Sequence, residues 1–237
     1  MSALVNHTLD LAEACIRTDV PADLGRIMFD TLEPYGLKAI FARAHDLWDS
    51  TAEPHIYARI SPAGWEDAYA REQLGRINPI NRAARTRART FVWSDIYQGD
   101  SAALKMWGML SDFGCHDGIA VPCHGTDGHV GVVSLAFERL GDLAPAERRG
   151  IEYAALMAHQ RLRELNPPTR HQPLKTLTPR ERDCLGFVAA GKTDWEISVI
   201  LSISQATVHS HVENAKRKLE SRSRAQAVAR FVYLGLA

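Results

Sequence analysis

Two matching helix-start signals, fifteen residues apart, constrain the C-terminal part of this chain more than any other feature. Thr178-Pro179-Arg180-Glu181 places a hydroxyl, a proline and a carboxylate where they cap a helix start, and Thr193-Asp194-Trp195-Glu196 repeats the hydroxyl and the carboxylate. Each pair satisfies backbone N–H groups that a helix start leaves unpaired. Gly191 is placed to close the first helix. The spacing therefore predicts two short helices joined by a tight turn.

A third helix is expected from Gln205 to Leu219, with Ser204 as its cap, and a fourth begins near Ser223. One face of the third helix is apolar, whereas the other is polar and partly basic. A helix that enters the DNA major groove is built in this way. The polar positions are Gln205, His209, Ser210, Glu213, Lys216 and Arg217.

This C-terminal stretch resembles the DNA-binding domain of the LuxR family over nearly its full length. The resemblance rests on Glu181, Leu185, Gly191-Lys192, Glu196-Ile197, Leu201, Ile203-Ser204, Thr207-Val208, His211, Asn214 and Lys218-Leu219. It implies base-edge contacts by His209, Ser210 and Glu213, and phosphate contacts by Lys192, Thr207, Arg217 and Lys218. Ser204 and Gln205, at the start of the same helix, complete the expected DNA-binding set.

The distribution of charge agrees with a DNA-binding end. The chain has 28 basic and 28 acidic residues, but from Leu174 onward there are 10 basic and 6 acidic ones, so this part is +4 and the remainder −4. Asn166 to Thr176 contains three prolines and no apolar periodicity. We therefore expect a sensor and dimerisation domain over 1–165, a linker over 166–176 and a helix-turn-helix domain over 177–237.

The N-terminal part mixes helical and strand patterns. Helical spacing runs over Ala22–Leu32 and Ala144–Leu165, and the turn at His124 to Gly128 indicates a hairpin. The fold class is therefore α+β: an N-terminal α/β/α sandwich with a mostly antiparallel sheet, joined to an all-α four-helix domain. Strands are expected at Lys38–Ala44, His55–Ile60, Gly118–Cys123 and Val130–Phe137.

The segment from Pro62 to Phe137 resembles the autoinducer-binding domain of LuxR-type quorum-sensing regulators. The matching residues are Trp65, Tyr69, Pro79, Trp93, Gly114, Gly118, Pro122, Gly131 and Ser134. In that family an N-acyl homoserine lactone lies in a closed pocket, held by a Trp indole, an Asp carboxylate and Tyr or Ser hydroxyls. The implied ligand is an N-acyl or aryl homoserine lactone. The ligand-binding residues expected from this resemblance are Trp65, Tyr69, Asn78, Trp93, Tyr97 and Ser134.

Two positions depart from the family pattern. Asn78 stands before Pro79 where the family has Asp, and Ser61 stands four residues before the Trp where Tyr is usual. The carbonyl of Asn78 can accept from a ligand amide through a neutral bond, or its NH2 group can donate to a ligand acceptor. A non-lactone ligand, or a domain that serves only for dimerisation, stays open as the alternative.

Other classes are disfavoured. The four cysteines are scattered singly, and neither a nucleophile motif nor a phosphate loop is visible, so we expect no enzyme, metal or cofactor. The first nineteen residues form neither a signal peptide nor a membrane span, which predicts a cytoplasmic protein with no membrane partner. The expected partners are double-stranded DNA, a small-molecule autoinducer and a second copy, paired through Ala154–Leu165 and Ala225–Leu234; contact with RNA polymerase stays open.

Overall fold

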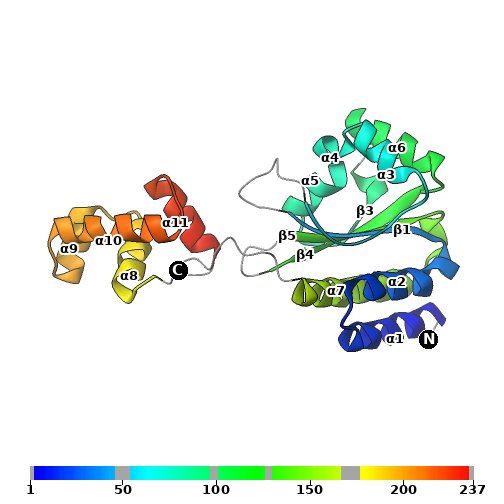
Figure 1. Cartoon of the computed structure of the whole chain (residues 1–237), viewed down its shortest axis with the longest axis horizontal. Coiled ribbons are helices and arrows are strands. Elements are labelled where there is room, and N and C mark those ends of the chain that lie inside the picture. Colours follow the sequence, from blue (N-terminus) through cyan, green and yellow to red (C-terminus); the bar gives the residue numbers. More distant parts are fainter. Residues whose placement is uncertain (1–2, 46–53, 97–100, 126–129, 167–176, 235–237) are drawn as a thin grey trace. The chain divides into compact units, whose positions relative to one another are not determined.

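The computed structural model describes residues 3–45, 54–96, 101–125, 130–166 and 177–234. These residues form an N-terminal and a C-terminal compact unit, each described by itself (Figure 1). Within these ranges, no helix is long and apolar enough to cross a bilayer. Residues 167–176, which contain most of the expected linker, lie outside the described ranges.

The N-terminal unit is built on one five-stranded sheet with the order β2-β1-β5-β4-β3, in which every neighbouring pair is antiparallel. The expected antiparallel sheet is therefore confirmed. The bounds of the strands are β1 Leu37–His45, β2 His55–Ile60, β3 Phe91–Val92, β4 Asp117–His124 and β5 Val130–Phe137.

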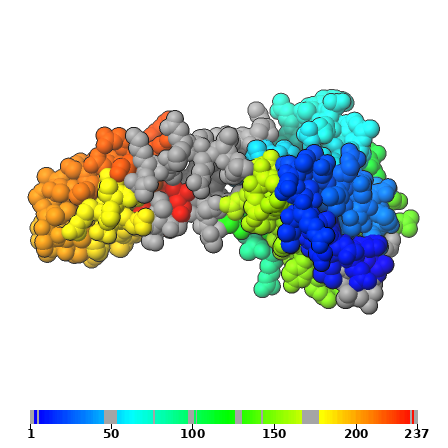
Figure 2. Space-filling view, turned by 60° about the horizontal axis from the view of Figure 1, so that its bottom comes forward, coloured from blue at the N-terminus to red at the C-terminus, as the bar shows by residue number. Residues whose placement is uncertain are grey.

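Helices cover both faces of this sheet, which gives the expected sandwich (Figure 1). On one face lie α2 Pro21–Leu32 and α7 Pro145–Leu165, and α1 Ala3–Arg17 packs on these two helices as an outer layer. In Figure 2, α1 and α2 form a continuous surface in blue. On the other face lie α3 Trp65–Arg71, α4 Leu74–Ile77, α5 Pro79–Thr86 and α6 Ser101–Asp112. Short 3-10 turns occupy Glu33–Tyr35, Trp93–Asp95 and Leu140–Asp142.

The central strand β5 shows why the sheet needs two covering layers, because all eight of its residues are buried. Successive side chains of a strand point to opposite faces. Val133, Leu135 and Phe137 accordingly join the core beneath α1, α2 and α7. Val132 and Ala136 join a second core beneath α3–α6. Ser134 lies between these two in the strand, so its side chain points to the same face of the sheet.

The sequence patterns located the long elements of this unit well. The helices expected at Ala22–Leu32 and Ala144–Leu165 and the four expected strands are confirmed to within one residue at each end. The pattern gave no bounds for α1 or for α3–α6. The helices α3, α4 and α5 are short, with 7, 4 and 8 residues, whereas α6 is as long as α2. β4 and β5 pair as an antiparallel hairpin, although residues 126–129 of its turn lie outside the described ranges.

The C-terminal unit is all-helical, as expected. Its helices are α8 Pro179–Ala189, α9 Asp194–Leu201, α10 Gln205–Lys218 and α11 Arg224–Tyr233. The hydroxyls of Thr178, Thr193, Ser204 and Ser223 each accept a hydrogen bond from the first turn of the helix that follows. Gly191 closes the turn after α8 with a φ of 82°.

Glu181 joins a helix start to the interior of this unit. Its side chain is 4% exposed; it accepts from the backbone N–H of Thr178 at 2.8 Å and from the ammonium of Lys218 at 2.6 Å. Burial alone would raise the pKa of the Glu181 carboxyl, but hydrogen bonds from Lys218 and Thr178 hold that pKa below its usual value. The capping carboxylate therefore also clamps the end of α10 to the start of α8.

Replacing Glu181 by Gln should lower the stability of the C-terminal unit by about 1–3 kcal/mol, since the Lys218 ammonium loses its anionic partner. Because the folded pKa is lowered, the stabilisation is present above the unfolded pKa of about 4.3 and is lost as pH falls through the folded pKa. Hydrogen exchange of α8 and α10 in the full chain measures this difference. Glu196→Gln, at the more exposed second cap, is the matched control, and an equal loss in both variants would contradict the role of Lys218.

Candidate functional site

A cavity of about 400 Å³ lies in the N-terminal unit, on the side of the sheet covered by α3–α6. A volume of this size suits a small organic ligand. The side chains that line it come from the sheet and from the covering helices. They are Phe41, Arg43, Pro54, Ile56, Arg59, Trp65, Glu66, Asp67, Tyr69, Ala70, Asn78, Ile80, Trp93, Met106, Leu110 and Ser134.

Trp65 and Tyr69 enter the cavity from α3. The helix begins directly after Gly64, whose φ of 80° is a conformation that glycine adopts readily. Trp65 is buried, with its ring 5.7 Å from that of Tyr69 and 5.4 Å from that of Phe113. One helical turn thus brings both expected residues to the same wall.

The side-chain oxygen and the side-chain NH2 group of Asn78 have different hydrogen-bond partners. Its Oδ1 caps α5 and accepts from the backbone N–H groups of Ile80 at 3.0 Å and Asn81 at 3.2 Å. Its Nδ2 donates to the hydroxyl of Tyr69 at 3.0 Å. The two backbone donors identify the capping atom as oxygen, so the NH2 group is the one on the side of Tyr69 and the cavity. Of the two alternatives left open by the sequence, the donor side is the one that this geometry favours.

Trp93 packs closely against Gly118 of β4 and lines the cavity. A Cβ on Gly118 would stand 2.5 Å from Cε2 and 2.6 Å from Cδ2 of the Trp93 ring, so only glycine lets the indole approach the sheet so closely. Trp93 is 2% exposed, and its Nε1 has no hydrogen-bond partner among the described residues. A buried donor of this kind is unusual, because such groups normally find a partner.

Ser134 and Arg43 lie on adjacent strands of the sheet. The Nη2 of Arg43 donates to the Ser134 hydroxyl at 3.1 Å, and both side chains are buried. Sequence reasoning missed Arg43. The available signal was a cation inside the otherwise mostly apolar strand segment Ala39–Ala44.

The cavity lining contains five of the six expected ligand residues, namely Trp65, Tyr69, Asn78, Trp93 and Ser134. Tyr97 lies outside the described residues. Ser61, which stands in place of the family tyrosine, donates to Glu66 at 3.2 Å and is not part of the lining.

The second candidate site is the outward face of α10. Val208, Val212 and Ala215 point inward and are buried, as the apolar stripe predicted. The residues expected to touch DNA on the opposite face are exposed, which leaves them accessible to a groove. These are Gln205, Thr207, His209, Ser210, Glu213 and Arg217.

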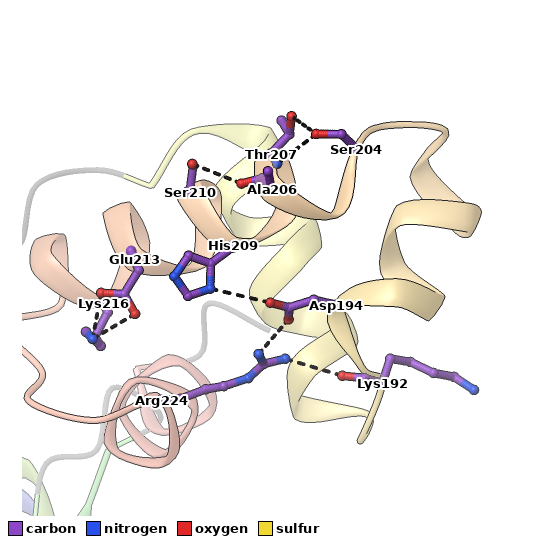
Figure 3. A network of polar contacts seen from close by, with 10 residues as sticks. All are labelled: Lys192, Asp194, Ser204, Ala206, Thr207, His209, Ser210, Glu213, Lys216 and Arg224. Atoms are coloured by element: carbon purple, nitrogen blue, oxygen red, sulfur yellow. Dashed lines mark hydrogen bonds and ion pairs between the residues drawn. The ribbon is translucent and has the colours of Figure 1, made fainter.

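Polar contacts hold this face in shape (Figure 3). The carboxylate of Asp194 lies 3.6 Å from Nδ1 of His209 and also pairs with Arg224. Glu213 pairs with Lys216 at 2.6 Å, and that hydrogen bond lowers the pKa of the Glu213 carboxyl. Sequence reasoning did not anticipate Asp194 and Arg224 as supports for the imidazole.

Several lysines and hydroxyl groups that the sequence predicted to contact DNA have protein partners in this structure. Lys218 pairs with the buried Glu181, and Lys192 pairs with Glu196 at 3.2 Å while staying largely exposed. Ser204 and Thr207 share a hydrogen bond of 2.7 Å at the start of α10. Lys218 is thus accounted for by packing, whereas Lys192 keeps an accessible ammonium.

Comparisons with known proteins decide what the two sites belong to. A family model described as "Autoinducer binding domain" matches residues 21–162, and one described as "Bacterial regulatory proteins, luxR family" matches residues 175–231. The chain belongs to the LuxR family of quorum-sensing transcription regulators. Members of this family are regulators rather than enzymes, so the helix-turn-helix is a DNA-binding module and the upstream domain a small-molecule module.

Curated LuxR-family relatives cover most of the chain. The quorum sensing-dependent regulator RpaR of Rhodopseudomonas palustris is 39% identical over 180 residues, which span 74% of this chain and 72% of RpaR. The transcriptional activator BjaR1 of Bradyrhizobium diazoefficiens is 33% identical over 88% of this chain and 83% of BjaR1.

Solved structures share the fold at lower identity. SdiA in complex with octanoyl-rac-glycerol has a TM-score of 0.72 at 19% identity and covers 100% of this chain and 97% of its own. CepR2 of Burkholderia cenocepacia has a TM-score of 0.53 at 19% identity, covering 73% of this chain and 100% of its own.

Replacing Gly118 by Ala should displace Trp93 and reshape the cavity, because the new methyl group would overlap both the indole ring and the backbone carbonyl oxygen of Leu135 on β5. Overpacking of this kind costs about 1–3 kcal/mol of stability. Thermal unfolding together with tryptophan fluorescence measures both effects. Gly108→Ala on α6 is the matched control, since a Cβ there meets nothing within 4 Å. Equal behaviour of the two variants would contradict the packing of Trp93 on Gly118.

Proposed function

We propose that this LuxR-family protein is a ligand-responsive transcription regulator that senses an N-acyl or aryl homoserine lactone and binds a palindromic promoter site as a dimer. The observation that carries the proposal is the cavity of about 400 Å³ inside the domain matched by the autoinducer-binding model, with Trp65 and Trp93 in its wall. Binding in this cavity would stabilise the folded sensor and so bias the regulator's active form.

The cavity has the two kinds of surface that an acylated ligand needs. Phe41, Ile56, Met106 and Leu110 supply apolar wall for a chain or ring. Polar groups come from the hydrogen-bonded pairs Asn78–Tyr69 and Arg43–Ser134. The names of similar proteins agree with this class, since CepR2 is described as N-acylhomoserine lactone dependent. SdiA was solved with an octanoyl ester, which also carries an apolar chain.

Thermal unfolding of the full chain against a panel of N-acyl and aryl homoserine lactones tests the ligand class. At a hundredfold excess over Kd, a cognate ligand adds about 2.7 kcal/mol of stability, which corresponds to a rise in Tm of roughly 5–10 °C for a domain of this size. Ile80→Trp, which fills the cavity, should abolish the rise. A Tm that stays constant across the panel would sink the lactone class and leave the DNA-binding assignment intact.

The exposed face of α10 supports major-groove binding. His209, Ser210 and Glu213 stand toward solvent within little more than one helical turn, with His209 oriented by Asp194. Arg217 follows on the same helix and donates to Asn214 at 2.6 Å, which suits a phosphate contact at the edge of the groove.

A homodimer is supported by apolar side chains left uncovered on α7. The expected stripe is used internally, since Ala154, Ala158 and Leu162 are buried in the core of their own unit. Tyr153 is 69% exposed instead, and Leu156 and Met157 beside it are also exposed. We propose this outer stripe as the surface that meets a second copy.

Arg217→Ala should weaken DNA binding about equally on all sequences, because a phosphate contact carries no base information. The dependence of log K on log salt concentration should become shallower by about 1. A salt titration of binding to duplex DNA measures both quantities. Arg26→Ala, an exposed arginine on α2, is the control and should change neither; a change in base preference without a change in slope would contradict the phosphate role.

A further inference from the structure

The cavity contains a buried cation, Arg43, to which the proposed function gives no role. Arg43 is 5% exposed, lines the cavity and is held by Ser134 on the neighbouring strand. Burial lowers the pKa of the Arg43 guanidinium, yet an arginine remains protonated in proteins. The N-terminal unit therefore keeps a full positive charge out of water.

No carboxylate among the described residues pairs with this charge. The two acids in the lining point elsewhere or lie in solvent, since Glu66 pairs with Arg59 at 2.8 Å and Asp67 is exposed. The Arg43 Nε has no hydrogen-bond partner within the described ranges, and its remaining neighbours are neutral: the Ser134 hydroxyl, the hydroxyl of Tyr69 and the ring of Phe41. A buried charge normally has a counter-charge.

Apart from Glu66 and Asp67, the polar side chains that line the cavity with Arg43 offer donors rather than free acceptors. Asn78 gives its oxygen to the backbone of α5 and its NH2 group to the cavity side, and the Trp93 indole N–H is unpartnered among the described residues. The hydroxyls of Tyr69 and Ser134 already accept from Asn78 and Arg43. Hence a ligand group placed here gains most when it is a strong acceptor with a negative charge.

We propose that the effector that binds in this cavity carries a carboxylate that pairs with the guanidinium of Arg43, and an apolar chain or ring that packs against the remaining wall. The fork of a guanidinium matches the two oxygens of a carboxylate. The proposal rests on the proposed function in one respect, namely that this cavity is the effector site. It narrows the effector from a neutral acyl lactone to an anionic relative.

Two sources of carboxylate fit this chemistry. In one, the lactone ring is opened by water, so that the carbonyl–oxygen ester bond breaks and an N-acyl homoserine carboxylate and a free hydroxyl result. In the other, the lactone is intact and the acyl or aryl part bears the acid. Three probes separate these sources: N-octanoyl homoserine lactone, its ring-opened sodium salt, and the lactone acylated by one carboxyl of suberic acid.

Calorimetric titration and thermal unfolding of the full chain with each probe form the test, with every lactone checked for ring opening after the run. We expect one of the two acids to bind more tightly than the neutral lactone. Arg43→Met should weaken binding of that acid by about tenfold to a hundredfold, because a charge-assisted bond is lost. Arg43→Met should also raise the Tm of the ligand-free protein, since the methionine buries no charge.

Two further variants keep the result interpretable. Arg71→Met removes an exposed arginine of α3 outside the cavity lining and should leave all three affinities unchanged. Asn78→Asp keeps the cap of α5 but adds a carboxylate on the cavity side, which should repel the acids and improve the neutral lactone.

Each outcome decides the proposal. Tighter binding of either acid that is lost in Arg43→Met supports it and identifies the source of the carboxylate. A neutral lactone that binds at least as well as both acids overturns it while leaving the proposed function standing. Acid binding that survives in Arg43→Met also overturns it, and no binding by any probe overturns the anionic effector together with the lactone class.

Discussion

Burial of both faces of one antiparallel sheet is the constraint on which the N-terminal unit depends. All eight residues of β5 are buried, and their side chains alternate between the core on one face of the sheet and the core on the other. The face toward α2 and α7 is filled by apolar residues of several sizes, from Ala42 to Phe137. The face toward α3–α6 carries Ser134 and Arg43 instead, and the space that they share with Trp65 and Trp93 is left as a cavity. The candidate ligand site is thus the place where one core of the sandwich is incompletely filled.

In the C-terminal unit, α10 is packed against its neighbours through one face only, and its other face is exposed. Hydroxyl caps start all four helices, and Glu181 fixes the far end of α10 through Lys218. The outer face of α10 does not pack against the rest of the unit, and its His209 is held by the carboxylate of Asp194. The buried residues of α10 and the hydrogen bonds at the helix starts together set the position of the candidate DNA-binding surface.

The sequence predicted the elements with strong periodicity and the residues with a family counterpart. The capping boxes, the long helices and the strands followed from local chemistry, and Trp65, Tyr69, Trp93 and Ser134 were found in the cavity wall by resemblance. The orientation of the Asn78 amide could not be predicted, because it depends on which of its atoms meets the backbone of α5. Arg43 was missed because its neighbours on β1 are apolar on both faces of the sheet, so hydropathy does not show which face each side chain takes. Lys218 was expected at phosphate because a basic run at a helix end looks alike whether it faces solvent or a buried Glu181.

The double use of Asn78 bears on how such a receptor can evolve. Asparagine and aspartate cap helices almost equally well, so exchanging one for the other leaves α5 in place. The same exchange replaces a donor by a negative charge in the binding wall. Most changes of a buried polar residue are eliminated because they damage folding. Here a single substitution alters the electrical character of the pocket while the cap of α5 is kept, and the folding cost that remains is that of a carboxylate in place of a buried amide. Selection on the bound molecule can therefore act at this position without also having to rebuild the start of α5.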